Sequence, residues 1–412
     1  MQRHDGRRAR GGGMSIVSTI VPETGRATAE AVLARVAAAP AVEPFSALAV
    51  DACDELARAL LRERAHPEVA SLGFWLRRAN VERLRASFLA GAQPGGITVP
   101  RGLAFHVPPA NVDTMALFSL TLSLLVGNRN IVRLSPRAGG AAAATMAALR
   151  RVLAQDRFAA LREGTAVVSY GHEPEPTAAF SAACDVRLVW GGDATVAALR
   201  SVPLGAGAKD LGFGDRFSLA AIDVEAYAIA DRDALAAALY ADAYPFDQGA
   251  CASPKLLVWV GDAERAAAAS DDLFSRLERL VSDRLGPLPT GAVTAKLAFA
   301  FGAAIDLPVT RVRRPSSALT VVTLATLDGF TREHPGAGLF FEACVPDVAD
   351  LARHVTRRDQ TICVHGVSPE PLAAAGADRV VGFGHALDFD HRWDGMDLLH
   401  ELTRRAVVEC AA

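Results

Sequence analysis

From residue 103 onward, short runs of β-branched and other apolar residues alternate with longer apolar segments, and this alternation limits what the chain can fold into. The runs that predict strands are residues 103–107, 130–134, 166–170, 186–190 and 217–222. Helical periodicity fills the intervals at residues 114–126, 141–155 and 194–202. Strands that alternate with helices of this length form βαβ units, which give a mainly parallel sheet covered by helices on both faces. The sequence therefore predicts the α/β class.

A second series of the same kind begins near residue 224. Its elements are expected at residues 231–242 (helix, with Asp231 as N-cap), 255–260 (strand), 262–285 (helix), 319–324 (strand) and 347–358 (helix). The chain has 412 residues, of which 51% are hydrophobic, and one compact core rarely holds so many. We therefore expect two doubly wound domains, each built on a parallel sheet.

The two ends of the chain differ in composition and hydrophobic pattern from the α/β part. Residues 1–13 are rich in arginine and glycine and predict a disordered extension, so Met14 could be the true start. Residues 24–92 predict an N-terminal helical segment, because apolar residues recur at helical intervals in 24–39 and 46–64. A strand, a turn and a terminal amphipathic helix are expected in residues 378–410.

Composition argues against several classes of function. The formal net charge of -3 offers no basic surplus for nucleic acid. The strongest apolar run, residues 115–126, is about half of the roughly 20 residues that a membrane-spanning helix needs, and no signal core is present. The 6 cysteines form no CxxC pair and no zinc spacing, so we expect reduced thiols, no metal and a cytoplasmic location.

The first loop that could carry chemistry is FHVPPANVDT, which leaves the strand at 103–107. Two prolines fix the backbone before Asn111, which stands at the entrance to an apolar helix. A short amide in this place can cap the helix, or it can donate a hydrogen bond to a developing oxyanion. The residues alone leave both roles open, and capping is the more common one.

Two further loops follow the carboxyl ends of expected strands, where α/β sheets bind ligands. At the carboxyl end of the strand at 130–134, Arg133 and Arg137 would lie where a phosphate or a ribose binds, although a solvated loop arginine is the more common outcome for Arg137. The glycine turn at 191–193 allows a pyrophosphate to approach closely, but such turns are widespread. No GxGxxG fingerprint follows the first strand.

The last loop, FDQGACASPK, places Cys251 between two alanines shortly before a strand. Small neighbours leave room for a bulky group to approach the sulfur. A loop cysteine beside exposed backbone N–H groups can be held as a thiolate nucleophile. A buried structural cysteine is the more common alternative. No single loop decides the function; their order and spacing do.

That order resembles the acyl-CoA reductase family typified by the fatty-acid reductase subunit of bacterial bioluminescence (LuxC), a branch of the aldehyde-dehydrogenase superfamily. The matching segments are RGLAFHVPPANVDT, LSLLVGNRNIVRLSPR, VRLVWGGDATV, FGDRFSLAAID, FDQGACASPK and DFDHRWDGMDLLHELTRR. The resemblance implies an aldehyde-dehydrogenase-like fold with a definite division of the chain. Residues 14–223 would hold the N-terminal helices and the dinucleotide-binding domain, 224–385 the catalytic domain, and 386–412 a segment that returns to the cofactor domain or to an oligomer interface.

The resemblance also implies catalytic roles. Asn111 corresponds to the amide that donates to the oxyanion, so the resemblance favours this role over capping. Cys251 corresponds to the nucleophile. Hydrolytic aldehyde dehydrogenases activate water with a glutamate in a Glu-Leu-Gly-Gly pattern; here the stretch reads KDLGFGDRFS, with Asp210 or Asp215 at most nearby. Glu342 is a loose counterpart of a second, cofactor-contacting glutamate. Loss of the water activator fits an acyl-enzyme that receives hydride.

The cofactor-binding residues that the resemblance implies are Arg133, Ser135, Arg137, Gly191, Gly192 and Thr195. In many NAD-preferring relatives an acidic residue follows the ribose-contacting lysine by about three positions, and this slot is Pro136 here. Without that carboxylate a 2′-phosphate is not repelled, and Arg137 could pair with it. NADPH is therefore the expected cofactor.

The sequence thus predicts NADPH-dependent reduction of a fatty acyl thioester, carried by CoA or by a protein, to the aldehyde through an acyl-enzyme on Cys251. The alternatives are NAD(P)-dependent oxidation of an aldehyde and a non-redox acyl transfer that keeps Cys251. Relatives commonly receive the acyl group from an acyl-protein synthetase, so such a partner is expected, as is a homo-oligomer.

Overall fold

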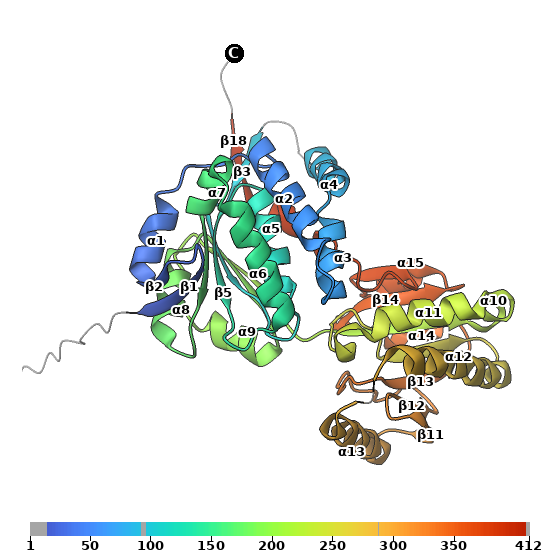
Figure 1. Ribbon diagram of the computed structural model, residues 1–412. Helices are drawn as coiled ribbons and strands as arrows, with labels where there is room; N and C mark the ends of the chain where they lie inside the picture. The colour runs from blue at the N-terminus through green and yellow to red at the C-terminus, as the bar shows by residue number, and fades with distance from the viewer. Residues whose placement is uncertain (1–14, 92–95, 287, 409–412) are drawn as a thin grey trace, which may run out of the picture. The chain divides into compact units, whose positions relative to one another are not determined.

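The computed structural model describes residues 15–91, 96–286 and 288–408, which divide into two compact units. The first unit contains the residues up to Phe213 together with those from Leu399 onward, and the second runs from Gly214 to Leu398. Each unit is built around a seven-stranded, mainly parallel sheet (Figure 1). The predicted α/β class with two doubly wound domains is confirmed. The predicted extension at residues 1–13 and Met14 lie outside the described residues.

The sheet of the first unit has the strand order β2-β1-β6-β5-β4-β7-β8. Its strands are β1 (Ile16–Val21), β2 (Gly25–Thr28), β4 (Leu103–Val107), β5 (Arg129–Leu134), β6 (Thr165–Ser169), β7 (Val186–Trp190) and β8 (Lys209–Phe213). The neighbouring strands β6, β5, β4, β7 and β8 are all parallel, and β1 and β2 add an antiparallel hairpin at one edge. β4 and β7 are buried along their whole length, as central strands between two layers of helices must be.

Helices cover both faces of this sheet. They are α1 (Ala29–Ala37), α5 (Met115–Leu125), α6 (Gly140–Leu153), α7 (Ala159–Glu163), α8 (Pro174–Ala183) and α9 (Asp193–Arg200), joined by the 3-10 turn η1 (Asp156–Phe158) and by the N-terminal helices α2 (Ala47–Leu60), α3 (Pro67–Trp75) and α4 (Arg78–Ala90). One face is packed by α1, α8 and α9 through side chains such as Val32, Phe180 and Leu199. Every residue of α5 is buried, which explains its apolar composition. Within the described residues, no helix combines the length and apolar character that crossing a membrane requires.

The N-terminal hairpin corrects one sequence prediction. The expected helix at 24–39 begins only at Ala29, because residues 25–28 form β2 and pair with β1. Gly25 turns the chain between the two strands at a φ of 83°, and the Thr28 side chain accepts a hydrogen bond from the Ala31 N–H as the N-cap of α1. A segment this short has too few residues to show whether its apolar pattern is that of a helix or of a strand. Hydrogen bonding to β1 determines that it forms a strand.

A separate two-stranded sheet corrects the prediction for the C-terminus. The expected amphipathic helix is reduced to α16 (Leu398–Glu401), after which β18 (Thr403–Val407) pairs antiparallel with β3 (Gly96–Pro100). The Arg101 side chain donates to the carbonyls of Glu401 and Thr403, at 3.0 and 2.8 Å, and fixes the start of this pairing. Pairing with β3 therefore determines the structure of this segment, although its local sequence pattern is helical.

The sheet of the second unit has the order β11-β12-β13-β10-β9-β14-β15, in which β11 pairs antiparallel with β12 and the other neighbours are parallel. Its strands are β9 (Phe217–Asp223), β10 (Leu256–Val260), β11 (Val309–Ser316), β12 (Leu319–Leu324), β13 (Leu339–Val345), β14 (Asp359–His365) and β15 (Arg379–Gly382), followed by the hairpin β16 (Arg392–Trp393) and β17 (Met396–Asp397). Its helices are α10 (Val224–Ile229), α11 (Arg232–Ala243), α12 (Ala263–Arg284), α13 (Thr290–Asp306), α14 (Val348–His354) and α15 (Pro369–Ala375). α11 and α12 pack on one face, and α13 to α15 on the other.

β9 differs from its predicted place. Residues 217–222 were expected in the first domain, with the boundary after residue 223, whereas β9 lies in the second sheet between β10 and β14. An apolar run shows that a strand is buried on both faces, but not which sheet it joins. The N-cap of α11 follows the prediction, since the Asp231 side chain accepts from the Ala234 N–H at 3.0 Å.

Candidate active site

The loop between β4 and α5 carries Asn111 at the carboxyl edge of the first sheet. α5 begins at Met115 with Thr114 at its N-cap position, so Asn111 does not cap the helix. The Asn111 side chain is exposed, and no hydrogen bond joins its amide to another residue that the structure describes. The amide is therefore open to a ligand, and the capping alternative does not hold.

Arg133 stands near the end of β5, half-buried beside an aromatic ring. Its guanidinium carbon lies 4.9 Å from the centroid of the Tyr170 ring, and Nη2 donates to the Gly171 carbonyl at 2.6 Å. Its Nε is buried and has no hydrogen-bond partner among the described residues. Because buried donors are nearly always paired, this orphaned nitrogen indicates a missing acceptor at the end of β5.

The turn after β5 contains Ser135 and Arg137. The Ala138 N–H donates to the Ser135 carbonyl at 3.0 Å, and the Arg137 N–H donates to the Ser135 hydroxyl at 3.2 Å, which leaves the Arg137 side chain exposed. Asp113, in the β4–α5 loop, accepts from the Gly139 N–H at 3.1 Å at the start of α6. The loops after β4 and β5 are thus held together directly.

The glycine turn after β7 leads straight into α9. Gly192 is the N-cap of this helix and makes no side-chain cap, so the first N–H groups of α9 receive no capping side chain, and Thr195 is exposed in the first turn. A Cβ on Gly191 would lie 3.3 Å from the Thr195 side chain, so a bulkier residue would crowd this approach. An uncapped helix N-terminus attracts phosphate groups.

The strand order explains why these loops belong to one site. β5 and β6 lie on one side of β4, and β7 and β8 lie on the other, so the order reverses between β4 and β7. Open α/β sheets bind ligands at this reversal, outside the carboxyl ends of the strands. The orphaned Arg133 Nε, the uncapped start of α9 and the loop at 108–113 all lie at that edge, and they fit a phosphate-bearing dinucleotide.

Two of the three acidic candidates from the sequence, Asp210 and Glu342, are engaged elsewhere. Asp210, on β8, pairs with the buried guanidinium of Arg187. Glu342, on β13, is buried and accepts from Arg313 and from Thr323. Both carboxylates are therefore structural counter-ions or acceptors. No group of His, Cys, Asp and Glu among the described residues is arranged to hold a metal ion.

In the second unit, Cys251 lies in a tight turn between the 3-10 turn η2 (Pro245–Gln248) and β10. The Ser253 N–H donates to the Ala250 carbonyl at 3.1 Å and closes this turn around Cys251 and Ala252. Cys251 is exposed, whereas the other cysteines that the structure describes are buried or partly buried: Cys53, Cys184, Cys344 and Cys363. Among the described cysteines, Cys251 is the one whose thiol a substrate could reach.

Backbone strain is concentrated just before this turn. Phe246, Asp247 and Gln248 have φ values of 58°, 53° and 62°, in the left-handed region. Non-glycine residues there cost about 1–3 kcal/mol each and persist when surrounding contacts enforce them. The Gln248 amide supplies such contacts, since Nε2 donates to the Pro254 carbonyl at 3.0 Å and Oε1 accepts from the Gly338 N–H at 3.1 Å. The strained turn therefore directs Gln248 inward to brace the cysteine loop.

The neighbouring strand β9 holds Cys251 from the other side. The Ser218 hydroxyl donates to the Cys251 carbonyl at 2.7 Å and accepts from the Thr361 N–H of β14 at 3.1 Å. The backbone N–H of Arg216 donates to the Cys251 sulfur. The central strands of the second sheet thus position both the backbone and the thiol of Cys251.

Lys255 was not among the residues that the sequence singled out. Its Nζ is buried beneath the cysteine turn and donates to the carbonyls of Ala250 and Ser253, at 2.9 and 3.3 Å. The available signal was a single lysine between the cysteine loop and the fully apolar strand LLVWV. A charged residue at the start of a buried strand calls for an explanation.

The thiol and the ammonium influence each other. Although part of Cys251 reaches solvent, the protein packed around its sulfur raises the pKa of the thiol, and Lys255 opposes this shift. Burial lowers the pKa of Lys255 to about 8, and the charge of Cys251 opposes that shift in turn. Burial and then the charge of Lys255 lower the pKa of His334 to about 3, so His334 is neutral.

A cavity of about 730 Å³ opens in the second unit beside Ala252, the residue that follows Cys251. Its wall includes Asp378, Asp390, Asp394 and Arg392. The same wall includes the apolar residues Val380, Val381 and Trp393, so the cavity has both charged and apolar surfaces.

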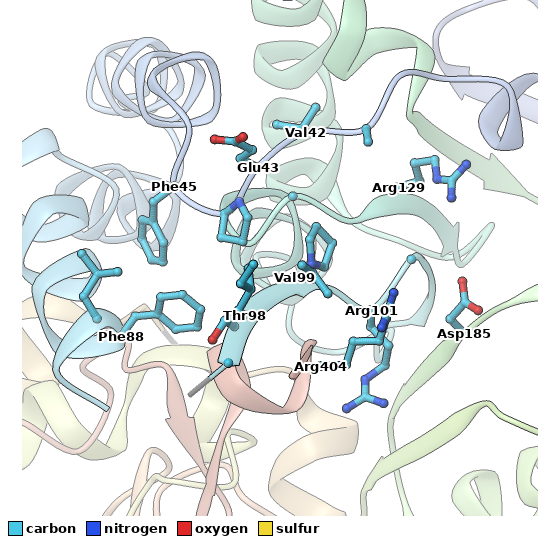
Figure 2. Close-up of a pocket in the computed structure, with 18 of the residues that line it drawn as sticks. Val42, Glu43, Phe45, Phe88, Thr98, Val99, Arg101, Arg129, Asp185 and Arg404 are labelled. Carbon is cyan, nitrogen blue, oxygen red and sulfur yellow. The ribbon is translucent and has the colours of Figure 1, made fainter. Parts of the chain in front are cut away.

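A larger cavity, about 1090 Å³, lies in the first unit (Figure 2). Phe45 and Phe88, with ring centroids 5.4 Å apart, form its apolar end, and Arg101, Arg129 and Asp185 form its charged end. The last three residues precede or begin β4, β5 and β7, so the cavity lies at the amino ends of the parallel strands. Since α/β sheets bind ligands at the opposite edge, we assign the candidate site to the loops.

Comparison with known proteins gives a family-model match to part of the chain and a shared fold. Residues 93–285 match the family model for acyl-CoA reductase (LuxC), a span that contains every site residue predicted from the sequence. No curated protein shows a significant match to the chain.

Many solved structures share the fold. Methylmalonate-semialdehyde dehydrogenase from Oceanimonas doudoroffii has a TM-score of 0.66 at 15% identity, covering 92% of this chain and 90% of its own. A putative aldehyde dehydrogenase from Burkholderia cenocepacia has a TM-score of 0.64 at 17% identity, covering 96% and 95%. A mutant of proline utilization A from Bradyrhizobium japonicum has a TM-score of 0.67 at 14% identity, covering 93% of this chain but 45% of its own, so the chain spans less than half of that protein.

At such identities the structures show a shared fold, and the predicted aldehyde-dehydrogenase-like architecture is confirmed. The family match ends at residue 285 and so leaves out the segment DFDHRWDGMDLLHELTRR, which also carries the resemblance in the sequence. Residues 93–285 thus match the family model for acyl-CoA reductase (LuxC), and the chain shares its fold with aldehyde dehydrogenases.

Proposed function

We propose that this protein reduces a fatty acyl thioester to the aldehyde with NADPH, and that Cys251 carries the acyl group. The observation that supports this most strongly is the exposed thiol of Cys251, seated in a turn that Gln248 and Ser218 brace from two sides. A nucleophile held in one geometry reacts without first having to be ordered. The match of residues 93–285 to the acyl-CoA reductase family model supports a thioester as the substrate.

The proposed chemistry proceeds through a second thioester. The Cys251 thiolate attacks the substrate carbonyl, a carbon–sulfur bond forms, and the carrier thiolate leaves and takes up a proton. A bound reduced nicotinamide supplies the hydride that reduces the acyl group. The thiohemiacetal alkoxide that forms on Cys251 re-forms its carbonyl as the carbon–sulfur bond breaks, which releases the aldehyde and restores the thiolate.

Asn111 and the backbone N–H of Cys251 are the proposed donors to the oxyanion of the reacting carbonyl. The amide of Asn111 suits this role because it is exposed and makes no hydrogen bond to a described residue. Each well-placed donor of this kind is worth about 3 kcal/mol of barrier lowering.

The proposed cofactor site is the carboxyl edge of the first sheet. Arg133 would hold the ribose through its orphaned Nε, and the uncapped start of α9 at Gly192 would meet the pyrophosphate. Gly191 and Thr195 would flank this turn, and Ser135 would shape the turn after β5. Arg137 is exposed and able to pair with a 2′-phosphate, which favours NADPH over NADH.

The engagement of Asp210 supports reduction rather than hydrolysis. This carboxylate neutralises Arg187 and is not free to activate water against an acyl-enzyme. An acyl group on Cys251 would then persist until hydride arrives. For the carrier we propose CoA or a protein thioester, with an acyl-protein synthetase as a further partner and a homo-oligomer as the working form.

Mass spectrometry of the intact protein with a panel of acyl-CoAs tests the proposal. We expect one acyl adduct on the wild type and on Cys344→Ala, the matched control, and none on Cys251→Ala. Equal acylation of the Cys251→Ala variant would contradict the mechanism. Single-turnover mixing then separates the alternatives, because reduction predicts rapid NADPH oxidation on addition of acyl-CoA. Rapid NAD-dependent acid formation from aldehyde would favour oxidation, and an adduct without NADPH oxidation would favour acyl transfer.

A further inference from the structure

The ammonium group of Lys255 is built into the turn that carries Cys251. Its Nζ donates to the carbonyl of Ala250, immediately before the cysteine, and to that of Ser253, two residues after it. The residue is 7% exposed and is the last one before β10, so the sheet fixes where its side chain starts. The charge is therefore held in place beside the nucleophile.

This buried cation lacks a carboxylate partner. No aspartate or glutamate among the described residues pairs with Lys255, and the opposite charge that acts on it is that of the Cys251 thiolate. A buried ammonium is costly unless it is paired, and two carbonyl acceptors provide dipoles but no counter-charge. The thiolate is the group that can complete the pair.

The other charged groups around the thiol act differently. Asp394 and Asp215 disfavour the thiolate, and the backbone N–H of Arg216 favours it. The Arg216 side chain is occupied with Asp378 and Asp394, and His334, near Lys255, is neutral. Lys255 thus supplies the positive side-chain charge that favours ionised sulfur.

We propose that Lys255 is a positioning residue for the nucleophile: it holds the cysteine turn through two carbonyls and stabilises the Cys251 thiolate as its counter-ion. The inference rests on the proposed role of Cys251 as the acyl carrier and adds a partner to it. Lys255 acts through Cys251 and exchanges no proton with the substrate.

The pH dependence of Cys251 alkylation by iodoacetamide tests this in the full chain. Lys255→Met keeps the length of the side chain and removes its charge, so alkylation at pH 7 should slow about tenfold and its midpoint should move to higher pH. Lys255→Arg keeps the charge and should stay close to the wild type. Peptide mapping, with Cys251→Ala as a blank, assigns the label to Cys251.

Lys296 provides the matched control. It is also buried in the second unit, its Nζ donates to the carbonyls of Ser317 and Ala337 at 2.7 and 2.8 Å, and burial lowers its pKa to about 8. Lys296→Met should destabilise the fold as Lys255→Met does, yet leave the alkylation profile of Cys251 unchanged. A Lys255→Met profile that matches the wild type would overturn the inference, as would an equal shift in both variants.

A second readout needs no variant and serves if Lys255→Met does not fold. While Lys255 is charged, it should attract anionic iodoacetate and so raise the rate of Cys251 alkylation by iodoacetate relative to neutral iodoacetamide. This rate ratio should fall as the pH rises through about 8 and Lys255 loses its charge. A rate ratio that does not change with pH contradicts the inference. If acyl-CoA leaves no adduct on Cys251 while alkylation depends on Lys255, the proposed function fails and this inference stands. If acyl-CoA does leave an adduct on Cys251 but alkylation does not depend on Lys255, the proposed function stands and only this inference is rejected.

Discussion

The guanidinium of Arg187 and the carboxylate of Asp210 join β7 to β8 through two hydrogen bonds of 3.1 and 2.7 Å. Arg187 is 1% exposed and also donates to the Ser181 hydroxyl and the Val202 carbonyl. Asp210 is the counter-ion of this buried cation. The stretch where hydrolytic aldehyde dehydrogenases would place a water-activating glutamate therefore serves the sheet of the first unit.

Asp210→Asn should lower the free energy of unfolding by about 3 kcal/mol, because it leaves Arg187 buried without a counter-charge. Urea denaturation measures this, and Glu225→Gln, which removes one partner of the exposed pair Arg265–Glu225, should cost less than about 1 kcal/mol. The rate at which an acyl-enzyme hydrolyses should stay unchanged in Asp210→Asn. A slower hydrolysis would show that Asp210 activates water after all.

Gly338→Ala should destabilise the second unit by about 3 kcal/mol or more. Gly338 has a φ of 71°, and a Cβ on it would lie 1.9 Å from the Ala318 carbonyl oxygen. Gly329 is the control, since its φ is 72° but nothing lies within 4 Å of a Cβ there. Gly329→Ala should cost about 1 kcal/mol, the strain of the backbone alone. Equal losses in thermal unfolding would show that contact with Ala318 is unimportant.

His391 should make stability depend on pH. Burial lowers its pKa, but Asp390 at 2.8 Å and Asp397 at 3.6 Å outweigh this and raise the pKa from 6.5 to about 9. The folded-state pKa is raised, so the stabilisation is complete below pH 6.5 and is lost as the pH rises through about 9.

The stability of the wild type should fall by about 1–2 kcal/mol across this window, and His391→Gln should flatten that part of the curve. Urea titrations at several pH values provide the measurement. His385→Gln is the control, since His385 pairs with Asp388 on the surface, and it should keep the slope of the wild type. A slope retained in His391→Gln would assign the effect to another group.

Asn111→Ala should lower kcat about 100-fold and leave stability unchanged. The loss follows from removing one oxyanion donor, and stability is spared because Asn111 caps no helix. Steady-state kinetics and thermal unfolding are the two measurements. A loss of stability with normal kcat would return Asn111 to a structural role.

Arg137→Ala should raise the KM for NADPH by about tenfold, since one charge-assisted contact with the 2′-phosphate is lost. The KM for NADH, which lacks this phosphate, should not change. A parallel rise for both cofactors would place Arg137 away from the 2′ position.

The sequence by itself determined the class of fold and much of the element series. β4, β7 and β12 have the predicted bounds, because strands buried between two layers of helices are mostly apolar or β-branched. The loops of Asn111 and Arg133 follow from strand order alone, since parallel strands end at one edge. Cys251 stood out through its small neighbours and its place among those loops.

Tertiary structure decided what local pattern cannot encode. β9 joined the second sheet and β18 replaced a helix because partner strands elsewhere in the chain supplied their hydrogen bonds. Asp210 became a counter-ion because Arg187 is buried on the adjacent strand. Lys255 acquired its place beside Cys251 because the turn folds its carbonyls onto the ammonium. Periodicity reports burial, but which groups meet depends on contacts between distant segments, and these form only when the chain packs.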